Sequence, residues 1–310
     1  MPARRWLLLL LALAAAPVRA AVLPLRTNDV VATVGGAHAV AAAGTGHLEA
    51  LAQAALPGLR LRFRSLAWEG DTVAVQPRDV NFPPATELIA RHGVTVLLVD
   101  FGRNEALDPA MTPARFREAY AARLEAFGRA APRRVLLTPP PFGDPPGEAG
   151  PDLSAPRDRL AALAVVIREL AAEGGLPVAD VHAGLAGLDP ARLTTDGVQL
   201  TGWAQAQAAE VVAAALAPAE RRSPAVDAAG RFADPDFEAL RQAVIAKNRL
   251  WHGYWRPTNW AFLWGDRMEQ PSSRDHRDRS RRWFPAEMEE FVPLIREAET
   301  RIGSLAAQIR

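Results

Sequence analysis

Short apolar runs alternate with amphipathic segments along residues 29–217 of this chain of 310 residues. Five runs are short, apolar and rich in β-branched residues, as buried strands are, and they lie at 30–34, 59–67, 94–102, 133–139 and 176–181. Five intervening segments have helical spacing, and they lie at 46–56, 85–93, 112–130, 156–175 and 202–217. This alternation predicts an α/β fold of three layers, in which a doubly wound parallel sheet of five strands carries helices on both faces. The continuous apolar runs beside glycine or proline disfavour the alternative, an all-helical protein.

The N-terminus, MPARRWLLLLLALAAAPVRA, combines a basic start with an apolar run and a small-x-small ending. This pattern predicts a signal peptide at residues 1–20, cleaved near Ala20, and a periplasmic or secreted protein. A membrane anchor would need roughly 20 apolar residues, so we expect no stable membrane span after cleavage. The α/β domain is then expected at 21–218.

Composition changes after this domain, and we interpret residues 219–310 as a linker followed by a helical extension that holds five of the eight tryptophans. The final helix is expected to begin near Pro285 and to carry an apolar stripe of Met288, Phe291, Leu294 and Ile295. Four large rings are expected to pack back on the first domain, against its outer helices rather than in a ligand cleft: Trp251, Trp255, Trp260 and Trp264. The run RDHRDRSRR interleaves aspartate with arginine, which favours a solvated loop.

Charge and cysteine content exclude several kinds of chemistry. Lysine and arginine number 36 against 35 aspartates and glutamates, so no overall field attracts nucleic acid. The chain has no cysteine, which excludes disulfides, thiolate metal sites and a cysteine nucleophile. A metal site built from His38, His47 and Asp71 lacks a recognisable ligand spacing. We therefore expect neither a metal nor a cofactor.

Candidate site residues follow the strands, since ligands of open parallel sheets bind beyond the carboxyl ends of the strands. Glycine-bearing turns come after the first three strands, at residues 35–37, 69–72 and 102–105. A fourth segment, TTDGVQLTGWAQ, stands after the fifth strand and before the last helix of the domain. Each turn alone is a weak signal, because glycine is common where a chain must bend.

Together, the four segments resemble the SGNH or GDSL hydrolase family over residues 28–216. The resemblance implies a flavodoxin-like hydrolase fold and assigns Gly70 and Asn104 as oxyanion donors and Asp196 as the triad acid. Ala37 then stands at the position of the nucleophilic serine, and Gln199 stands at the position of the histidine base. Glu105, next to Asn104, is the carboxylate expected to touch a ligand, with a solvated loop acid as the alternative.

Chemistry at these positions argues against ester hydrolysis. Ala37 has no oxygen to attack an ester, and the neutral amide of Gln199 cannot accept a proton near pH 7. The favoured hypothesis is a degenerate esterase that binds an acylated or carbohydrate ligand, or an envelope protein, without turning it over. Asp196 is then expected to hold its loop or cap the last helix.

Two alternatives stay open. One is an active ester hydrolase, such as a carbohydrate O-deacetylase or a small-ester esterase, that uses a rearranged site. Its displaced pair would combine His38 or His47 with the hydroxyl of Thr45 or Thr72. Against this, His38 is more naturally interpreted as a residue at a helix start or on the surface. The other alternative makes the Trp-rich extension the functional part, docking the protein into an envelope assembly.

Overall fold

The computed structural model describes residues 22–78, 81–147, 150–217 and 221–309. The predicted signal peptide and its cleavage site lie outside these residues. Five strands form one sheet in the order β2-β1-β3-β4-β5, and every neighbouring pair is parallel. The strands are β1 (Val30–Gly35), β2 (Arg62–Ser65), β3 (Val96–Asp100), β4 (Arg133–Leu137) and β5 (Val178–Ala179). The predicted fold class is confirmed.

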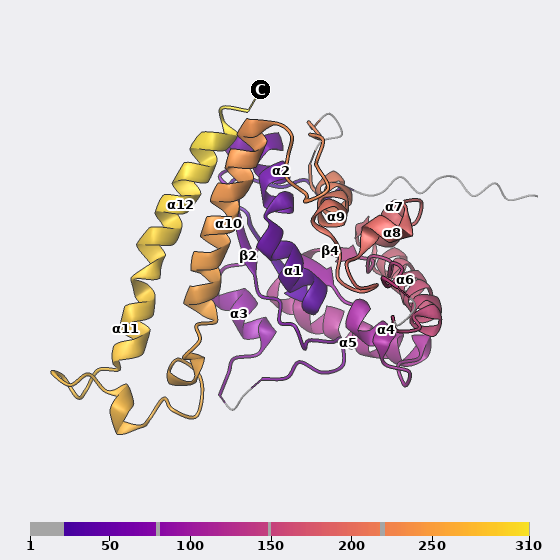
Figure 1. Ribbon diagram of the computed structural model, residues 1–310. Coiled ribbons are helices and arrows are strands. Elements are labelled where there is room, and N and C mark those ends of the chain that lie inside the picture. Colours follow the sequence, from indigo (N-terminus) through magenta and orange to yellow (C-terminus); the bar gives the residue numbers. More distant parts are fainter. Residues whose placement is uncertain (1–21, 79–80, 148–149, 218–220, 310) are drawn as a thin grey trace, which may run out of the picture.

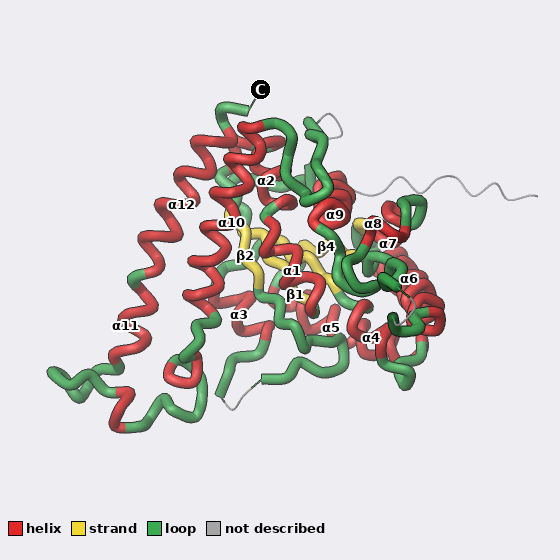
Figure 2. Tube along the Cα trace, in the orientation of Figure 1, coloured by secondary structure: helices red, strands yellow, loops and turns green. Residues whose placement is uncertain are grey.

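Helices cover both faces of this sheet, as Figure 2 shows. The helices of one layer are α3 (Ala85–Arg91), α5 (Pro113–Ala130) and α6 (Ser154–Gly174). The helices of the other layer are α1 (Ala37–Thr45), α2 (His47–Ala55), α7 (Val181–Leu185), α8 (Pro190–Leu193) and α9 (Gly202–Ala214). Side chains of β1 alternate between the two faces of the sheet. Val30 and Ala32 pack in the apolar core under α3, α5 and α6, and Val31 packs in the core under α2, α7 and α9.

Helix α1 is not among the five helices that the hydrophobic pattern predicts, although His38 was expected at a helix start. It begins at Ala37, directly after β1 and Gly36, and its segment AHAVAAAGT is nearly uniformly small and apolar. Alanine favours a helix, but a segment without polar positions shows no helical period. The short helix α4 (Arg103–Leu107) likewise occupies a predicted turn, after β3.

The C-terminal extension adds a further layer beside the sheet. Its helices are α10 (Pro235–Trp255), α11 (Trp283–Glu289) and α12 (Phe291–Ala306), with short 3₁₀ turns at Trp260–Phe262 and Pro271–Ser273. A third 3₁₀ turn, Pro57–Leu59, precedes β2. Helices α10 and α12 run side by side in Figure 1 and pack on each other. No helix among the described residues is long and apolar enough to span a membrane.

Helix α10 packs along β2, the strand at the edge of the sheet. The Lys247 Nζ donates to the carbonyl oxygen of Phe63 at 3.0 Å, and the Trp251 Nε1 donates to that of Ser65 at 2.8 Å. Trp251 and Trp255 are buried against the first domain, so the expectation that these rings fold back on it is confirmed. The extension therefore covers a strand edge that would otherwise expose unpaired backbone groups.

The predicted final helix differs from the structure in one respect. It is two helices, α11 and α12, which break at Glu290. Met288 and Ile295 are buried as expected, whereas Leu294 is 48% exposed. Helix α12 contributes Ile295, Ile302 and Ala306 to the interior, and this spacing turns Leu294 toward solvent.

Candidate functional site

The predicted nucleophile position lies at the start of α1. Ala37 is the first residue of the helix and is half-buried, while Gly36 before it is buried. A Cβ atom at Gly36 would lie 2.4 Å from the Asn104 Nδ2 and 2.8 Å from the carbonyl oxygen of Asp71. Only glycine fits here without displacing its neighbours. The structure thus brings together the turns after β1, β2 and β3.

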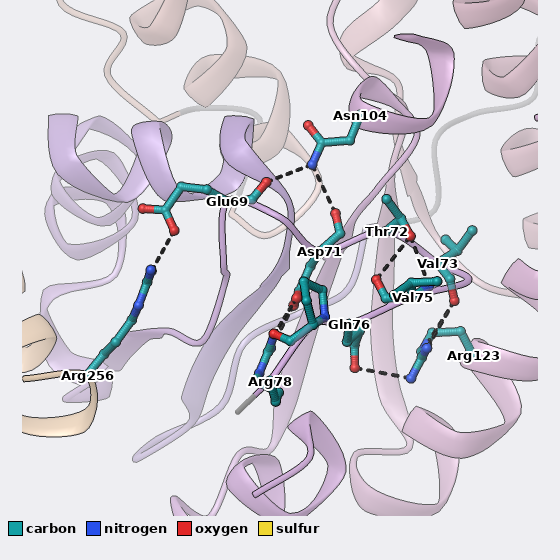
Figure 3. Close-up of polar contacts among 11 residues, drawn as sticks. Glu69, Asp71, Thr72, Val73, Val75, Gln76, Arg78, Asn104, Arg123 and Arg256 are labelled. Atoms are coloured by element: carbon teal, nitrogen blue, oxygen red, sulfur yellow. Dashed lines mark hydrogen bonds and ion pairs between the residues drawn. The ribbon is translucent and has the colours of Figure 1, made fainter. Parts of the chain in front are cut away.

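The Asn104 amide is fully engaged by the neighbouring turn. Its Nδ2 donates to the carbonyl oxygen of Glu69 at 2.8 Å and to that of Asp71 at 3.1 Å (Figure 3). An amide NH₂ group has two hydrogens, so both of its donors serve the protein itself. Gly70 lies in an exposed turn, and its N–H makes no hydrogen bond among the described residues.

The acidic residue of this turn is a structural brace. Asp71 is buried and accepts two hydrogen bonds from Arg78, at 2.5 and 2.8 Å. Burial raises the pKa of Asp71, and Arg78 acts in the opposite direction. The guanidinium of Arg78 also lies over the Trp68 ring, 4.5 Å from its centroid, and that of Arg256 lies 3.7 Å from it. Arg256 further donates to the Glu69 carboxylate at 2.6 Å, which ties the extension to this turn.

The expectation that Glu105 touches a ligand is wrong. Glu105 is only 1% exposed, so it is not a solvated loop acid either. One carboxylate oxygen accepts from the Val73 N–H at 2.7 Å and the other from the Gly102 N–H at 2.8 Å. Burial raises the pKa of Glu105, and these hydrogen bonds oppose that effect. The side chain therefore fixes two turns from the inside and does not face a cleft.

Asp196 and Gln199 share one exposed loop. The Asp196 Oδ1 accepts from the backbone N–H of Val198 at 2.8 Å and from that of Gln199 at 2.6 Å. These hydrogen bonds, with the Gln199 N–H first, lower the pKa of Asp196 despite a small opposing effect of burial. Asp196 thus holds its loop, as expected, and Thr201 caps α9 instead.

Arg103 connects this loop to the turn that carries Asn104. Its guanidinium is buried and donates to the carbonyl oxygen of Val198 and, at 2.8 Å, to that of Pro140. No hydrogen bond or ion pair of the described residues joins Asp196 or Gln199 directly to Ala37. The loop that carries Asp196 and Gln199 is thus held by contacts to its backbone. No side chain of this loop is placed to take a proton from a group at Ala37.

His38 is the functional candidate whose environment the sequence described least well. Of the two environments expected for it, a helix start or the surface, the first is the observed one, and its side chain is only 9% exposed. Its Nε2 lies 3.8 Å from the Asp100 Oδ2. Burial lowers the pKa of His38 to about 3 and raises the pKa of Asp100 to about 7. Asp100 is the last residue of β3, and no sequence signal marked it as different from an ordinary polar residue at the end of a strand.

The three residues considered for a metal site lie in different environments. His38 faces Asp100, Asp71 binds Arg78, and the His47 Nε2 lies 2.6 Å from the carbonyl oxygen of Gly230. The described part of the chain holds no group of three or more side chains that could ligate a metal ion.

Comparison with solved structures identifies the class of fold. The chain is similar to a gut microbial diltiazem-metabolizing enzyme, with a TM-score of 0.51 and 15% identity, over 63% of this chain and 48% of that one. It thus spans about half of that protein. It also matches a lipase/acylhydrolase from Enterococcus faecalis, with a TM-score of 0.46 and 18% identity, over 60% of this chain and 93% of that one. A third match is a catalytic mutant of an acetylxylan esterase from Geobacillus stearothermophilus. Its TM-score is 0.44 and its identity 16%, over 62% of this chain and 93% of that one.

The fold belongs to the doubly wound α/β class. The sheet order and the likeness to the first of these structures define this class, and a helical extension follows the sheet at the C-terminus. No protein-family model matches the sequence, and no curated protein is significantly similar to it.

Proposed function

We propose that this chain is an exported protein with an SGNH-type fold that binds an acylated carbohydrate and does not hydrolyse it. The observation that carries this proposal is the engagement of the Asn104 amide, which lies beside Gly36. A tetrahedral intermediate needs free donors aimed at its oxyanion, but both Asn104 donors bind the carbonyl oxygens of Glu69 and Asp71.

The missing groups support the same conclusion. Ala37 cannot supply a nucleophile, and Gln199 cannot accept a proton. His38 does not replace them, because the cavity that it lines does not include Ala37, Gly70 or Asn104. An oxyanion donor alone accelerates such reactions by only on the order of a thousandfold over water. For an ordinary ester this leaves no useful turnover.

A groove beside the Glu69 turn supports binding of a carbohydrate. It encloses about 300 Å³ and is lined by Trp68, His252, Gly253, Arg256, Pro257, Thr258 and Trp260. Aromatic and polar side chains thus meet in one concave surface, as in many sites for small polar ligands. His252 and Thr258 are exposed and can hydrogen-bond a sugar hydroxyl or an acyl carbonyl. Two arginines already lie over the Trp68 ring, so we assign stacking of a sugar to Trp260.

Restoring the missing groups tests the loss of catalysis. We expect the parent to hydrolyse p-nitrophenyl acetate at the rate of a heat-denatured control and to form no adduct with a fluorophosphonate. Ala37→Ser and Gln199→His should each change little, whereas the double variant should gain on the order of a hundredfold, because triad members act as a unit. Asp196→Asn should abolish this gain. Rapid turnover in the parent that survives Asn104→Ala would overturn the proposal.

Binding is measured separately by calorimetric titration of the parent with acetylated and deacetylated oligosaccharides. We expect saturable binding to the parent. Thr258→Trp narrows the groove and should weaken this binding at least tenfold. The matched control Thr300→Trp alters an exposed threonine on α12, remote in sequence from the groove, and should bind as the parent does. A failure to bind any of these oligosaccharides would contradict the ligand class and leave the catalytic result standing.

A further inference from the structure

A second groove lies between α1 and α10 and adjoins the groove beside the Glu69 turn. It has a volume of about 450 Å³, and we refer to it as the α1–α10 groove. The two grooves share His252 and Gly253. In addition, Ala67 lines the α1–α10 groove and the next residue, Trp68, lines the other. A ligand bound beside the Glu69 turn can therefore extend into the α1–α10 groove.

Apolar side chains form most of the α1–α10 groove. Helix α10 contributes Ile245, Trp251 and Trp255, and α1 contributes Val40 and Ala43. The two tryptophans are buried, and the other three residues are half-buried. A ligand that covers these side chains removes apolar surface from water, which favours binding. Among the described residues, no aspartate or glutamate lines this groove.

Polar side chains of this groove are largely engaged within the protein. The Trp251 Nε1 donates to the carbonyl oxygen of Ser65, and the Asn248 Nδ2 donates to that of Ala43, both at 2.8 Å. Arg249 is exposed, and an arginine can cover hydrocarbon with its aliphatic stem while its guanidinium stays in water. The groove thus suits a hydrocarbon chain better than a sugar.

Helix α1 leads from the Ala37 turn into this groove. Ala37, Val40 and Gly44 follow one another at intervals of three and four residues, so they lie on one side of the helix. Val40, which lines the groove, is about 4.5 Å from Ala37 along the helix axis. A chain that follows this side of α1 thus begins near the turns at the carboxyl edge of the sheet.

The dimensions of the groove set the length of that chain. Ile245 and Trp255 are about 15 Å apart along α10. A carbon–carbon single bond is about 1.5 Å long, so a zigzag chain of about ten carbons spans most of this distance. An apolar cavity of about 150 Å³ holds the six carbons of benzene, so about 450 Å³ has room for such a chain. An acetyl group would leave most of the groove to water.

We propose that the acyl group of the ligand is a linear chain of about ten carbons, which lies in the α1–α10 groove while the sugar stacks on Trp260. This inference rests on the proposed function and narrows its ligand to a medium-chain acyl sugar. The ester carbonyl then lies at His252, where the two grooves meet, and can accept a hydrogen bond from its imidazole. Helix α10 contributes to both grooves, so the extension shapes the whole binding site.

Two glucose esters test the length of the chain. 6-O-Decanoylglucose, kept below the concentration at which it forms micelles, and 6-O-acetylglucose are each titrated calorimetrically into the mature protein. We expect the decanoyl ester to bind at least tenfold more tightly, because only its chain covers the apolar side chains of the groove. Equal affinities of the two esters would overturn the inference and leave the proposed function standing.

Gly44 offers a variant that fills the groove. It is exposed near the end of α1, and a Cβ atom there would meet nothing within 4 Å, so a large side chain can be accommodated. Gly44→Trp should abolish the preference for the decanoyl ester and leave binding of the acetyl ester unchanged. The matched control Gly303→Trp, on α12, has equally open surroundings, lines neither groove and should keep the preference. If Gly44→Trp fails to fold, Gly44→Leu takes its place.

The same titrations separate this inference from the proposed function. Thr258→Trp narrows the other groove and should weaken binding of both esters. Decanoyl binding that Gly44→Trp abolishes and Thr258→Trp leaves unchanged would support the acyl groove and contradict the sugar groove. A preference for the decanoyl ester that survives Gly44→Trp would place its chain elsewhere and overturn the inference.

Discussion

At the scale of single residues, the polar side chains of the turns after β2 and β3 act as structural supports. Asn104 holds the Glu69 turn, Asp71 holds Arg78, and Glu105 fixes two backbone N–H groups. The Asn104 contact is exposed, that of Asp71 is half-buried and that of Glu105 is buried, and each stabilises a turn at the carboxyl edge of the sheet. The exception is Asp100, whose carboxyl group is buried without such a contact.

Asp100 should give the stability of the protein a measurable pH dependence. Its folded pKa of about 7 is above the ordinary 3.8, so the native state holds a proton that the unfolded chain releases. The bound proton adds to the free energy of unfolding. This addition is fully present below pH 3.8 and is lost as the pH rises through 7. His38, with a pKa lowered to about 3, has the opposite dependence in this range. The Asp100→Asn variant lacks the pH dependence that comes from Asp100 and keeps that from His38. Its free energy of unfolding relative to that of the parent should therefore increase between pH 4 and 8, by at most about 4 kcal/mol.

Urea unfolding of both proteins at pH 4.5, 6 and 8 measures this difference. Asp158→Asn, at an exposed position, is the control and should differ from the parent by the same small amount at each pH. A difference between Asp100→Asn and the parent that stays constant with pH would show that Asp100 titrates normally in the folded state.

At the scale of secondary-structure elements, the main feature is the contact between α10 and the edge strand β2. Lys247 is fully buried and donates to Glu49 of α2 at 2.7 Å as well as to the Phe63 carbonyl oxygen. One side chain thus links the extension, a helix of the first domain and the sheet.

Removing one partner of this buried pair should be severe. Lys247→Met leaves the Glu49 carboxylate buried without its cation, and we expect a loss of about 3–5 kcal/mol in the free energy of unfolding. The double variant Lys247→Met/Glu49→Leu removes both charges and should recover most of that loss. Chemical denaturation measures the free energy of unfolding of the single and the double variant. Arg129→Ala, in the exposed Arg129–Glu125 pair, should cost no more than about 1 kcal/mol. A double variant as unstable as the single one would show that packing, and not the unpaired charge, dominates.

The sequence predicted elements better than it predicted contacts. The five strands could be found because buried β-branched runs are local signals, and the meeting of the turns after the first three strands follows from their parallel order. Helix α1 was missed because a uniformly apolar segment has no period. The burial of Glu105 and the proximity of His38 to Asp100 depend on how separate turns pack, which no local pattern encodes.

At the scale of the whole molecule, the extension is an integral layer. Phe237, Leu240 and Val244 of α10 pack with Leu51 of α2 and Ala213 of α9 in one apolar cluster. The aromatic rings of the extension meet those of the first domain around Phe82, which contacts Trp68, Trp255, Trp260 and Trp264.

Truncation tests this integration. A mature chain that ends before Ala225 would expose both the apolar cluster and the carbonyl groups of β2, and exposed strand edges promote association. We expect a lower thermal midpoint or aggregation, measured by differential scanning fluorimetry and light scattering. A truncated chain that is monodisperse and melts like the parent would show that the first domain is self-sufficient.

The arginine that links the extension to the Glu69 turn bears on how such a chain can evolve. Arg256 covers one face of Trp68 and binds Glu69, so residues nearly 190 positions apart share one local structure. A recombination event that exchanged the extension for an unrelated segment would leave the Trp68 ring and the Glu69 carboxylate without their common partner. A change in either segment therefore favours a compensating change in the other, so the two segments are expected to vary together.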